Sequence, residues 1–497
     1  MEYISTRGSA PPISSKKAIL KGIAEDNGLY LPSCLPAIGP DPFSGIGGRA
    51  YAPRAARILP FFLTDYAKAD LSAACEAAYG DHFDSPVTAP VAFLKDNTAV
   101  LELWHGPTLA FKDMALQLMP RLLSLALKDE AEKYEVVILV ATSGDTGKAA
   151  LEGFAGAEGV RIFVFYPHEG VSEIQRLQMV TQRGGNVGAC AVEGNFDDAQ
   201  TGVKQIFSDP AINQRLEKDH FRLSSANSIN WGRLAPQIVY YFSAYEEMAA
   251  AGKIRRGEPI LICVPTGNFG NILAAYYAVQ CGLPASRLIC ASNRNKILTD
   301  FIRTGVYDRR REFFKTESPS MDILISSNLE RLLYELAGRC APAVADWMGK
   351  LSAQGRYAIE GEPLKKLQAL FYGGFADRAE TLRAIRNGFE EEGYLMDTHS
   401  AVAYSVLKKY RQETGDGAPA LLTSTASPFK FSDAVLEALG RDTKGRNEFT
   451  LLEELAKISG QPVPVRLSEL QSLPEIHNGV CAKEKMAGAL ARFLRIG

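Results

Sequence analysis

The sequence predicts an α/β fold with two domains of parallel-type twisted sheets flanked by helices, and two observations support this prediction. Between residues 136 and 291, short apolar runs alternate with amphipathic segments long enough to form helices. Such alternation builds βαβ units, because parallel neighbouring strands need a long crossover connection. The chain has 497 residues with 46% hydrophobic content, which is enough to bury large cores and predicts roughly three domains.

The expected elements follow the apolar periodicity along the chain. We expect strands at residues 136–141, 161–166, 186–193, 260–264, 287–291 and 420–423. We expect helices from about residue 146 and at 171–182, 196–207, 230–251 and 271–280. The segment 1–90 is rich in Pro and Gly, becomes helical over 65–78, and is expected to form an N-terminal subdomain. A large domain is expected at 91–133 and 252–497, mostly helical beyond 320, and a small domain at 134–251.

Composition argues against several classes of function. The net charge of −2 and the pI of about 6.4 give no excess of positive charge to attract nucleic acid or an anionic membrane surface. The first residues have no apolar signal core, and no run reaches the length of a membrane span. Eight cysteines are scattered without a Cys-x-x-Cys pair and the six histidines are dispersed. We therefore expect a reduced, cytoplasmic protein without a metal site.

Two loops follow expected strands and open into helices, which is where ligands sit in open α/β sheets. Residues 265–271 contain two glycines, so the backbone can approach a ligand, and the amides at the helix start favour a phosphate. This loop lacks both the Gly-Lys-Ser/Thr of a Walker loop and the Gly-x-Gly-x-x-Gly of dinucleotide folds. Residues 142–147 form a second anion loop of similar construction. An ordinary strand-to-helix turn and a capping turn are the alternatives for the two loops.

Two further patterns carry less weight. Residues 424–430 place hydroxyls after the strand at 420–423, where one can donate to a heterocyclic nitrogen without adding charge, although this run alone is weak support. The Gly-x-Gly-x-x-Ala match at 45–50 follows a Pro-rich loop rather than a strand, so we reject it as a dinucleotide site.

The run at residues 105–113 places Lys112 among uncharged residues, directly after an aromatic side chain. Burial disfavours the ammonium form, and an uncharged amine can form a Schiff base. Lys112 is therefore a candidate nucleophile, although a buried lysine can equally be structural.

Several segments together resemble the threonine synthase family of pyridoxal-phosphate enzymes, which has the tryptophan-synthase-β-like fold (fold type II). The resemblance rests on residues 3–8 and 28–32, the run 105–113, and the loops 142–147 and 265–271. It also rests on 227–233, 318–323 and 397–402, and the order and spacing of these segments extend over nearly the whole chain.

The resemblance implies a role for each matching residue. Lys112 would form the Schiff base with pyridoxal 5′-phosphate, and Thr425 would face the pyridine nitrogen. The cofactor phosphate would lie against Gly267, Asn268, Phe269, Gly270 and Asn271. The substrate α-carboxylate would lie against Ser143, Gly144, Asp145 and Thr146, and the substrate phosphate against Asn227, Ser228 and Arg233 with Thr146. A guanidinium suits that last role, because it grips a phosphate through paired donors.

The implied reaction converts O-phospho-L-homoserine and water to L-threonine and phosphate in a monomer or homodimer. Two alternatives stay open: a phospho-lyase that gives 2-oxobutanoate from the same substrate, and a catalytically silent binding protein of the same fold. One departure is visible, since many relatives have a histidine where this chain has Ser427. That departure puts a proton-transfer role at position 427 in doubt and leaves Thr425 unaffected.

Overall fold

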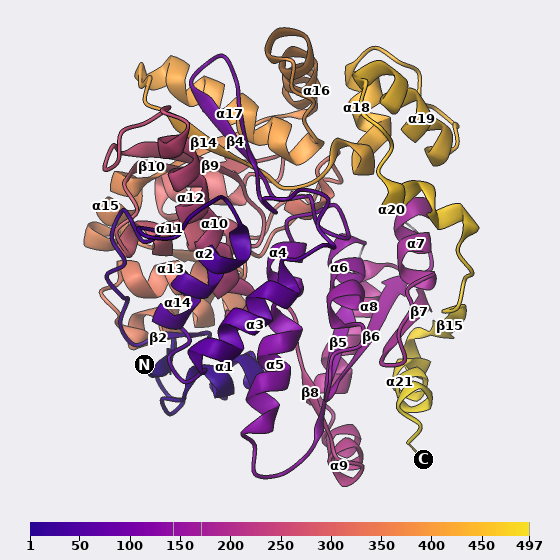
Figure 1. Ribbon diagram of the computed structural model, residues 1–497. Coiled ribbons are helices and arrows are strands. Elements are labelled where there is room, and N and C mark those ends of the chain that lie inside the picture. Colours follow the sequence, from indigo (N-terminus) through magenta and orange to yellow (C-terminus); the bar gives the residue numbers. More distant parts are fainter. Residues whose placement is uncertain (143, 170, 497) are drawn as a thin grey trace.

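The computed structural model describes residues 1–142, 144–169 and 171–496 and arranges them around two sheets (Figure 1). The larger sheet has the strand order β13-β10-β9-β14-β4-β3. Its neighbouring strands are parallel, except that β3 runs antiparallel to β4. The strands are β3 (Val91–Phe93), β4 (Thr98–Glu102), β9 (Ile260–Pro265), β10 (Ala285–Ser292), β13 (Phe371–Phe375) and β14 (Ala420–Ser424).

The smaller sheet has the order β15-β7-β6-β5-β8, and all of its strand pairs are parallel. Its strands are β5 (Glu135–Ala141), β6 (Val160–Pro167), β7 (Val187–Glu193), β8 (Phe221–Ser224) and β15 (Gly479–Ala482). Two short antiparallel pairs lie outside the sheets: β1 (Tyr3–Ser5) with β2 (Tyr30–Pro32), and β11 (Val306–Asp308) with β12 (Arg356–Ala358). Parallel sheets flanked by helices confirm the expected α/β class.

Helices pack on both sheets. Those that precede the smaller sheet are α1 (Ser15–Lys21), α2 (Tyr51–Ile58), α3 (Lys68–Ala78), α4 (Asp113–Leu116) and α5 (Met119–Lys128). The next group is α6 (Asp145–Phe154), α7 (Glu173–Val180), α8 (Phe196–Ser208), α9 (Pro210–Lys218), α10 (Trp231–Ala250), α11 (Gly270–Gln280) and α12 (Ile297–Thr304). The last group is α13 (Leu329–Leu336), α14 (Ala341–Gln354), α15 (Gly361–Leu370), α16 (Arg378–Asn387), α17 (Thr398–Thr414), α18 (Ser432–Ala438), α19 (Glu448–Ser459), α20 (Val465–Ser468) and α21 (Met486–Leu494).

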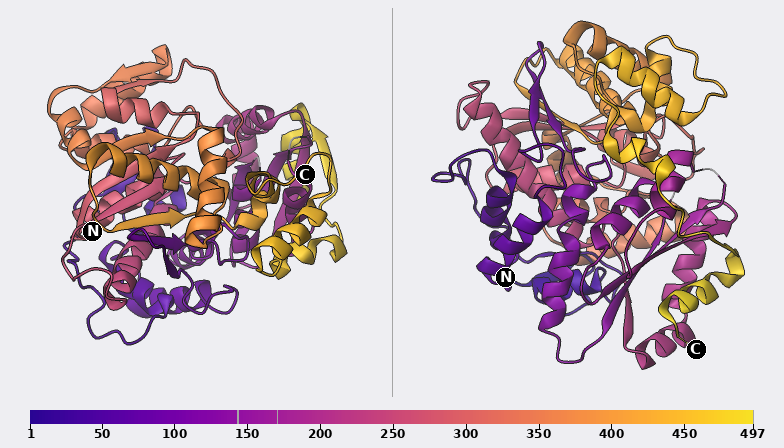
Figure 2. Two further views of the ribbon diagram at one scale, coloured as in Figure 1. Left: turned by 90° about the horizontal axis from the view of Figure 1, so that it is seen from above. Right: turned by 45° about the vertical axis from the view of Figure 1, so that its right-hand side comes forward.

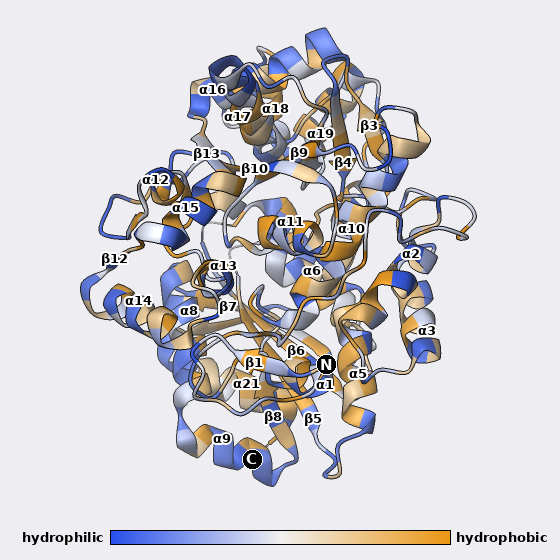
Figure 3. Cartoon of the chain, turned by 90° about the vertical axis from the view of Figure 1, so that its left-hand side faces the viewer, coloured by the Kyte–Doolittle hydropathy of each residue, from blue (hydrophilic) through white to orange (hydrophobic). Residues whose placement is uncertain are grey.

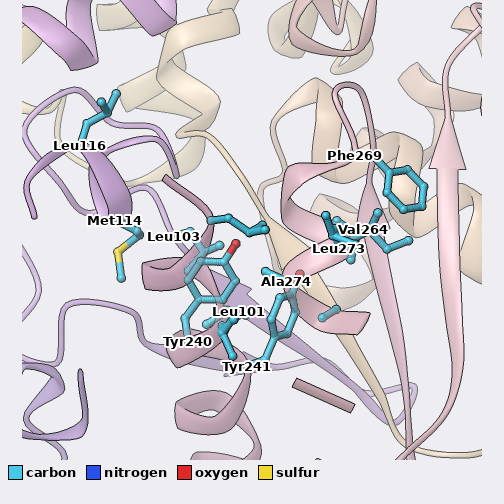
Figure 4. Close-up of a cluster of buried hydrophobic side chains, with 14 of the residues drawn as sticks. Leu101, Leu103, Met114, Leu116, Tyr240, Tyr241, Val264, Phe269, Leu273 and Ala274 are labelled. Atoms are coloured by element: carbon cyan, nitrogen blue, oxygen red, sulfur yellow. The ribbon is translucent and has the colours of Figure 1, made fainter. Parts of the chain in front are cut away.

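Helix α10 lies in the core of the larger lobe, since it is apolar around most of its circumference and buried along most of its length. It packs against α11, α4 and α2. Figure 4 shows Tyr240 and Tyr241 of α10 near Leu101 of β4 and Leu273 of α11. The surface helices α9 and α16 are mostly hydrophilic (Figure 3). No helix of the described residues is long and apolar enough to cross a bilayer.

The six expected strands are confirmed, each within two residues of its expected bounds. The expectation of a single strand beyond residue 320 is wrong, because β12, β13 and β15 also lie there. Strand β13 is difficult to recognise in sequence, since Gly373 and Gly374 interrupt its short apolar run. Gly373 permits a close approach, because a Cβ there would lie 3.0 Å from the backbone of Thr299.

Strand pairing and helix packing require two changes to the expected domain division. Strand β15, expected in the large domain, pairs with β7 of the smaller sheet, and the C-terminal segment runs beside that lobe (Figure 2). Helix α10, expected in the small domain, packs against α11 and α4. We propose a division in which 231–251 belongs to the large domain and 479–496 to the small one.

Candidate active site

Lys112 ends a rigid loop between β4 and α4. The backbone N–H and hydroxyl of Thr108 donate to the Asp113 carboxylate at 2.8 and 2.7 Å. Leu109 has a φ of +58°, which a residue with a Cβ adopts only where its surroundings enforce it. The backbone N–H of Phe111 donates to the carbonyl of Thr425 at 2.8 Å, which joins this loop to the segment after β14. These contacts restrain the backbone of the loop that carries the Lys112 amine.

The Lys112 amine lies in a buried and electrostatically mixed environment. Its side chain is 10% exposed, and Nζ donates to the Ser320 hydroxyl at 3.3 Å. Burial lowers the pKa of Lys112 to about 8, against the opposing effect of Asp145, whose Oδ2 lies 3.9 Å from Nζ. The cations Lys430 and Arg233 lower this pKa further. A neutral amine, which is the nucleophilic and basic form, is therefore accessible near neutral pH.

Asp145, the first residue of α6, forms a buried ion pair with Lys430. The Lys430 Nζ lies 2.7 Å from Asp145 Oδ1 and donates to the Thr108 carbonyl at 2.9 Å. Burial acts to raise the pKa of Asp145, but Lys430 and Lys112 outweigh it, so this pKa lies well below its ordinary value. The Asp145 carboxylate is ionised, and because Lys430 occupies it, only the backbone N–H of Asp145 is suited to receive an anion.

The Lys112 amine donates to the first of three residues that are hydrogen-bonded in series. Ser320, whose hydroxyl accepts from Lys112, donates its backbone N–H to His399 Nε2 at 3.2 Å. An imidazole nitrogen that accepts carries no proton, so Nδ1 of His399 is the protonated nitrogen. Nδ1 donates to Asp397 Oδ2 at 2.8 Å, and both side chains are buried. The tautomer of His399 and the place of Ser320 are therefore determined by Asp397.

The loop after β9 leads directly into the first turn of α11. Phe269 has a φ of +62° and directly precedes α11, whose first amides are free of intrahelical partners. Asn271 accepts hydrogen bonds from the hydroxyls of Tyr240 (2.6 Å) and Tyr241, which orient its amide. The Nδ2 of Asn271 is buried without a hydrogen-bond partner in the described part of the chain. A buried hydrogen-bond donor without a partner favours a ligand that carries a hydrogen-bond acceptor.

Arg233 lies in the first turn of α10 and is only 3% exposed. Its Nη1 donates to the Ala226 carbonyl at 2.7 Å, whereas Nε is buried and finds no partner among the residues that the structure describes. Burial lowers the pKa of Arg233 to about 10. A charged group buried this deeply without a counterion favours an anionic ligand.

Asn328 joins the Arg233 segment to the loop after β9. Its Nδ2 lies 3.3 Å from the Ser228 hydroxyl and 3.0 Å from the Asn268 carbonyl, and donates to both. The Asn328 amide is in turn oriented by Arg331, which donates to Asn328 Oδ1 at 2.6 Å. The two candidate anion sites therefore share one scaffold.

Three family models match the chain. The model described as threonine synthase N terminus matches residues 2–79, and that of the pyridoxal-phosphate dependent enzymes matches 96–425. A third model, threonine synthase, C-terminal, matches 400–480. The chain belongs to the threonine synthase family of pyridoxal-phosphate dependent enzymes.

Members of the threonine synthase family resemble the chain over most of its length. A threonine synthase from Pseudomonas aeruginosa is 42% identical over 88% of the chain and 90% of its own length. The human protein named threonine synthase-like 1 is 38% identical over 97% of the chain, which spans 65% of the length of that relative. The crystal structure of a PLP-bound threonine synthase from Brucella melitensis, 37% identical, superposes with a TM-score of 0.88 and full coverage of both chains.

The residues present fit the cofactor of the threonine synthase family. The chain offers an amine with a lowered pKa, a helix start with an open Asn271 amide, and a hydroxyl residue at 425 whose carbonyl is hydrogen-bonded to the Lys112 loop. These features match an aldehyde, a phosphate and a pyridine nitrogen, respectively.

The structure brings most of the expected site residues together. Residues 267–271 lie on the loop after β9, and Thr425 lies against the Lys112 loop. Gly144 has a φ of +150° and Thr146 is half-buried in the first turn of α6, while Ser143 lies outside the described residues. Asn227 and Ser228 precede α10, with Asn227 exposed.

Sequence reasoning missed three residues of the site, Lys430, Ser320 and His399. Ser320 and His399 lie inside segments on which the resemblance rests, and Lys430 ends the hydroxyl-rich run at 424–430. The contacts of Lys430 with Asp145, of Ser320 with Lys112 and of His399 with Ser320 join parts of the chain that are far apart in sequence. Ser427 is fully buried, and its hydroxyl accepts from the Phe429 N–H at 3.4 Å, so it caps the short 3-10 helix Pro428–Phe431. His399 is the imidazole next to Ser320.

Proposed function

We propose that the protein is a threonine synthase, a lyase that converts O-phospho-L-homoserine and water to L-threonine and inorganic phosphate. One proton leaves Cα and one leaves Cβ, and phosphate leaves Cγ. Water then adds oxygen at Cβ, and protons return to Cγ and Cα.

The observation that carries this proposal is an excess of buried positive charge between two anion-binding loops. Lys112, Lys430 and Arg233 lie in one electrostatic neighbourhood with the carboxylates of Asp145 and Asp113, so the three cations outnumber the two carboxylates that act on Lys112. A substrate with a carboxylate at one end and a phosphate at the other would compensate this charge. A dehydratase substrate without a phosphate would leave Arg233 uncompensated.

Lys112 would hold the cofactor aldehyde, the loop from Gly267 to Asn271 its phosphate, and Thr425 its pyridine nitrogen. When bound, pyridoxal phosphate supplies an electron sink that makes the Cα proton of an amino acid removable. A neutral hydroxyl at the pyridine nitrogen, unlike a carboxylate, does not favour its protonation, which moderates that sink.

The Lys112 amine, once free, is the base for Cα and again for Cβ. Its pKa of about 8 leaves part of it neutral near physiological pH, and Ser320 accepts its hydrogen bond at 3.3 Å. Because His399 anchors the backbone of Ser320, the amine is directed by an element outside the loop that carries it. The nearby Asp145 carboxylate then stabilises the ammonium that each proton transfer produces.

Arg233 would receive the substrate phosphate and stabilise its charge as it leaves Cγ. Its open Nε, together with Ser228 and Thr146, would supply donors for that group. The N-terminal amides of α6, at Gly144 and Asp145, would hold the α-carboxylate at the positive end of the helix dipole. The Asp145 side chain does not take part in this contact, since Lys430 engages it.

The experiment is an assay of the purified holoenzyme with O-phospho-L-homoserine, in which threonine, 2-oxobutanoate and phosphate are all quantified. We expect equal amounts of threonine and phosphate. A main product of 2-oxobutanoate would make the protein a phospho-lyase, and the absence of both products would make it a binding protein. Lys112→Ala should abolish phosphate release and the visible Schiff-base band, whereas Lys408→Ala, at a partly buried ion pair with Asp96, should change neither.

A further inference from the structure

A second cleft lies apart from Lys112, between α3, α5 and the end of α6. Its volume is ≈ 500 Å³, which is within the range of small-molecule sites. One wall is a face of α3 with Ala73, Ala74 and Ala77, and the opposite wall includes Gly153 and Ala155. Small side chains on both walls leave this space open.

A polar group at the bottom of the cleft has no partner. Gln117, at the C-terminal end of α4, is 5% exposed and lines the cleft. Its Nε2 is buried and makes no hydrogen bond within the described residues. An amide in that state costs free energy that a bound acceptor would recover.

Arg121 adds a guanidinium next to this amide. One of its nitrogens, Nη1, donates to the backbone carbonyl of Gln117 at 2.5 Å, and both residues line the cleft. Burial lowers the pKa of Arg121, and the group that acts against this is Tyr79 rather than a carboxylate. The Arg121 cation is thus half-buried, and it forms no ion pair with a carboxylate among the described residues.

The charges around the cleft select among anions. Asp70, Glu152 and Glu158 also line it, and Lys128 is the one other cation of the lining. These acids oppose a phosphate or a dicarboxylate, whereas a single carboxylate can pair with Arg121 through two parallel hydrogen bonds. The alanines of α3, with Pro120 and Leu125 of α5, offer apolar contact to the remainder of such a molecule.

We propose that this cleft binds a small monocarboxylate with an apolar body, whose carboxylate lies on Arg121 and Gln117. The site connects to the candidate active site through two helices. Helix α6 starts at Asp145 and ends at the cleft, and α4 is flanked by Lys112 at its N-terminus and Gln117 at its C-terminus. They touch without a gap at Gly153, where a Cβ would lie 2.0 Å from the Leu116 carbonyl. A ligand in the cleft would therefore brace the helices that carry Lys112 and Asp145.

The test is calorimetric titration of the holoenzyme with three probes of similar shape: 4-methylpentanoate, L-leucine and isoamylamine. We expect saturable binding of the two carboxylates and none of the amine. Arg121→Met should weaken 4-methylpentanoate binding about tenfold or more, the usual effect of losing a charge-assisted hydrogen bond, and Gln117→Met by several-fold. Ala77→Leu, which fills the space and leaves the polar groups in place, should also weaken it about tenfold.

Two control variants test whether the carboxylate binds in this cleft. Lys128→Met removes a charge at the rim and should change the affinity by less than about twofold. Arg233→Met alters the candidate active site and should leave the affinity unchanged. The proposal is overturned if neither carboxylate binds the wild type, if the amine binds as well as the carboxylates, or if Arg233→Met abolishes binding while Arg121→Met retains it. Since no turnover is measured, these outcomes are independent of the proposed reaction.

Discussion

The most direct test of the electrostatics around Lys112 is to remove the negative charge of Asp145 by Asp145→Asn. At 3.9 Å and an effective dielectric constant of about 20, one unit charge changes the free energy of the other by about 4 kcal/mol. At about 1.4 kcal/mol per pKa unit, this corresponds to a ceiling of about 3 units. Solvent and side-chain relaxation reduce the effect, so we expect the pKa of Lys112 to fall from about 8 to about 6.

The assay is the rate at which pyridoxal phosphate forms its Schiff base with the apoprotein, followed by visible absorbance over a range of pH. Only the neutral amine reacts, so the midpoint of this profile reports the pKa of Lys112. Lys430→Met should move the midpoint in the opposite direction, because that cation lowers the same pKa and its loss frees Asp145 for Lys112. Asp96→Asn, at the far end of β4, is the matched control and should leave the midpoint in place.

The reasoning is refuted if Asp145→Asn leaves the midpoint unchanged, or if both substitutions move it in the same direction. The first result would mean that Lys112 does not sense Asp145 at the distance observed. The second would mean that each substitution acts by disturbing the loop rather than through its charge.

Four further predictions follow from the site. Arg233→Met should raise the KM for O-phospho-L-homoserine about 10- to 100-fold without loss of bound cofactor, and an unchanged KM would contradict the assigned phosphate contact. Thr425→Asp should shift the products from threonine toward 2-oxobutanoate, measured as their ratio, and an unchanged ratio would count against the role of the neutral hydroxyl. His399→Asn should lower kcat about tenfold with little change in KM, because the Ser320 backbone N–H loses its hydrogen bond to the imidazole. Changes of equal size in kcat and KM would indicate that His399 contacts the substrate instead. The folded-state pKa of Lys112, about 8, lies below its ordinary value of 10.5, so burial of this lysine costs up to about 3 kcal/mol below pH 8 and nothing above 10.5. Lys112→Met should therefore stabilise the apoprotein against urea at pH 7, and identical unfolding midpoints there would exclude this penalty.

The sequence was sufficient to predict the strands around the site because their apolar runs are long and end in recognisable loops. Strand β9, for example, is an uninterrupted buried run that leads directly into the loop at 266–271. Asn271 and Thr425 follow two such strands, whereas β4, which precedes the Lys112 loop, was not among the expected strands.

Contacts between distant loops were beyond sequence reasoning, because they depend on how two lobes meet. Lys430 and Asp145 are 285 positions apart in number yet form an ion pair of 2.7 Å, and no local pattern identifies either as the partner of the other. Strand β15 was missed for a related physical reason. It is short and half exposed, and its strand conformation depends on pairing with β7 rather than on its own apolar pattern.

The pairing of β15 with β7 has a consequence for how the protein folds as it is synthesised. Strands β5 to β8 leave the ribosome well before residue 479, so β7 must wait as an open edge while some 290 residues follow it. Exposed edges recruit other chains, which makes this interval the period of greatest risk for aggregation during biosynthesis. A released chain truncated before residue 479 should therefore depend on chaperones more strongly than the full chain.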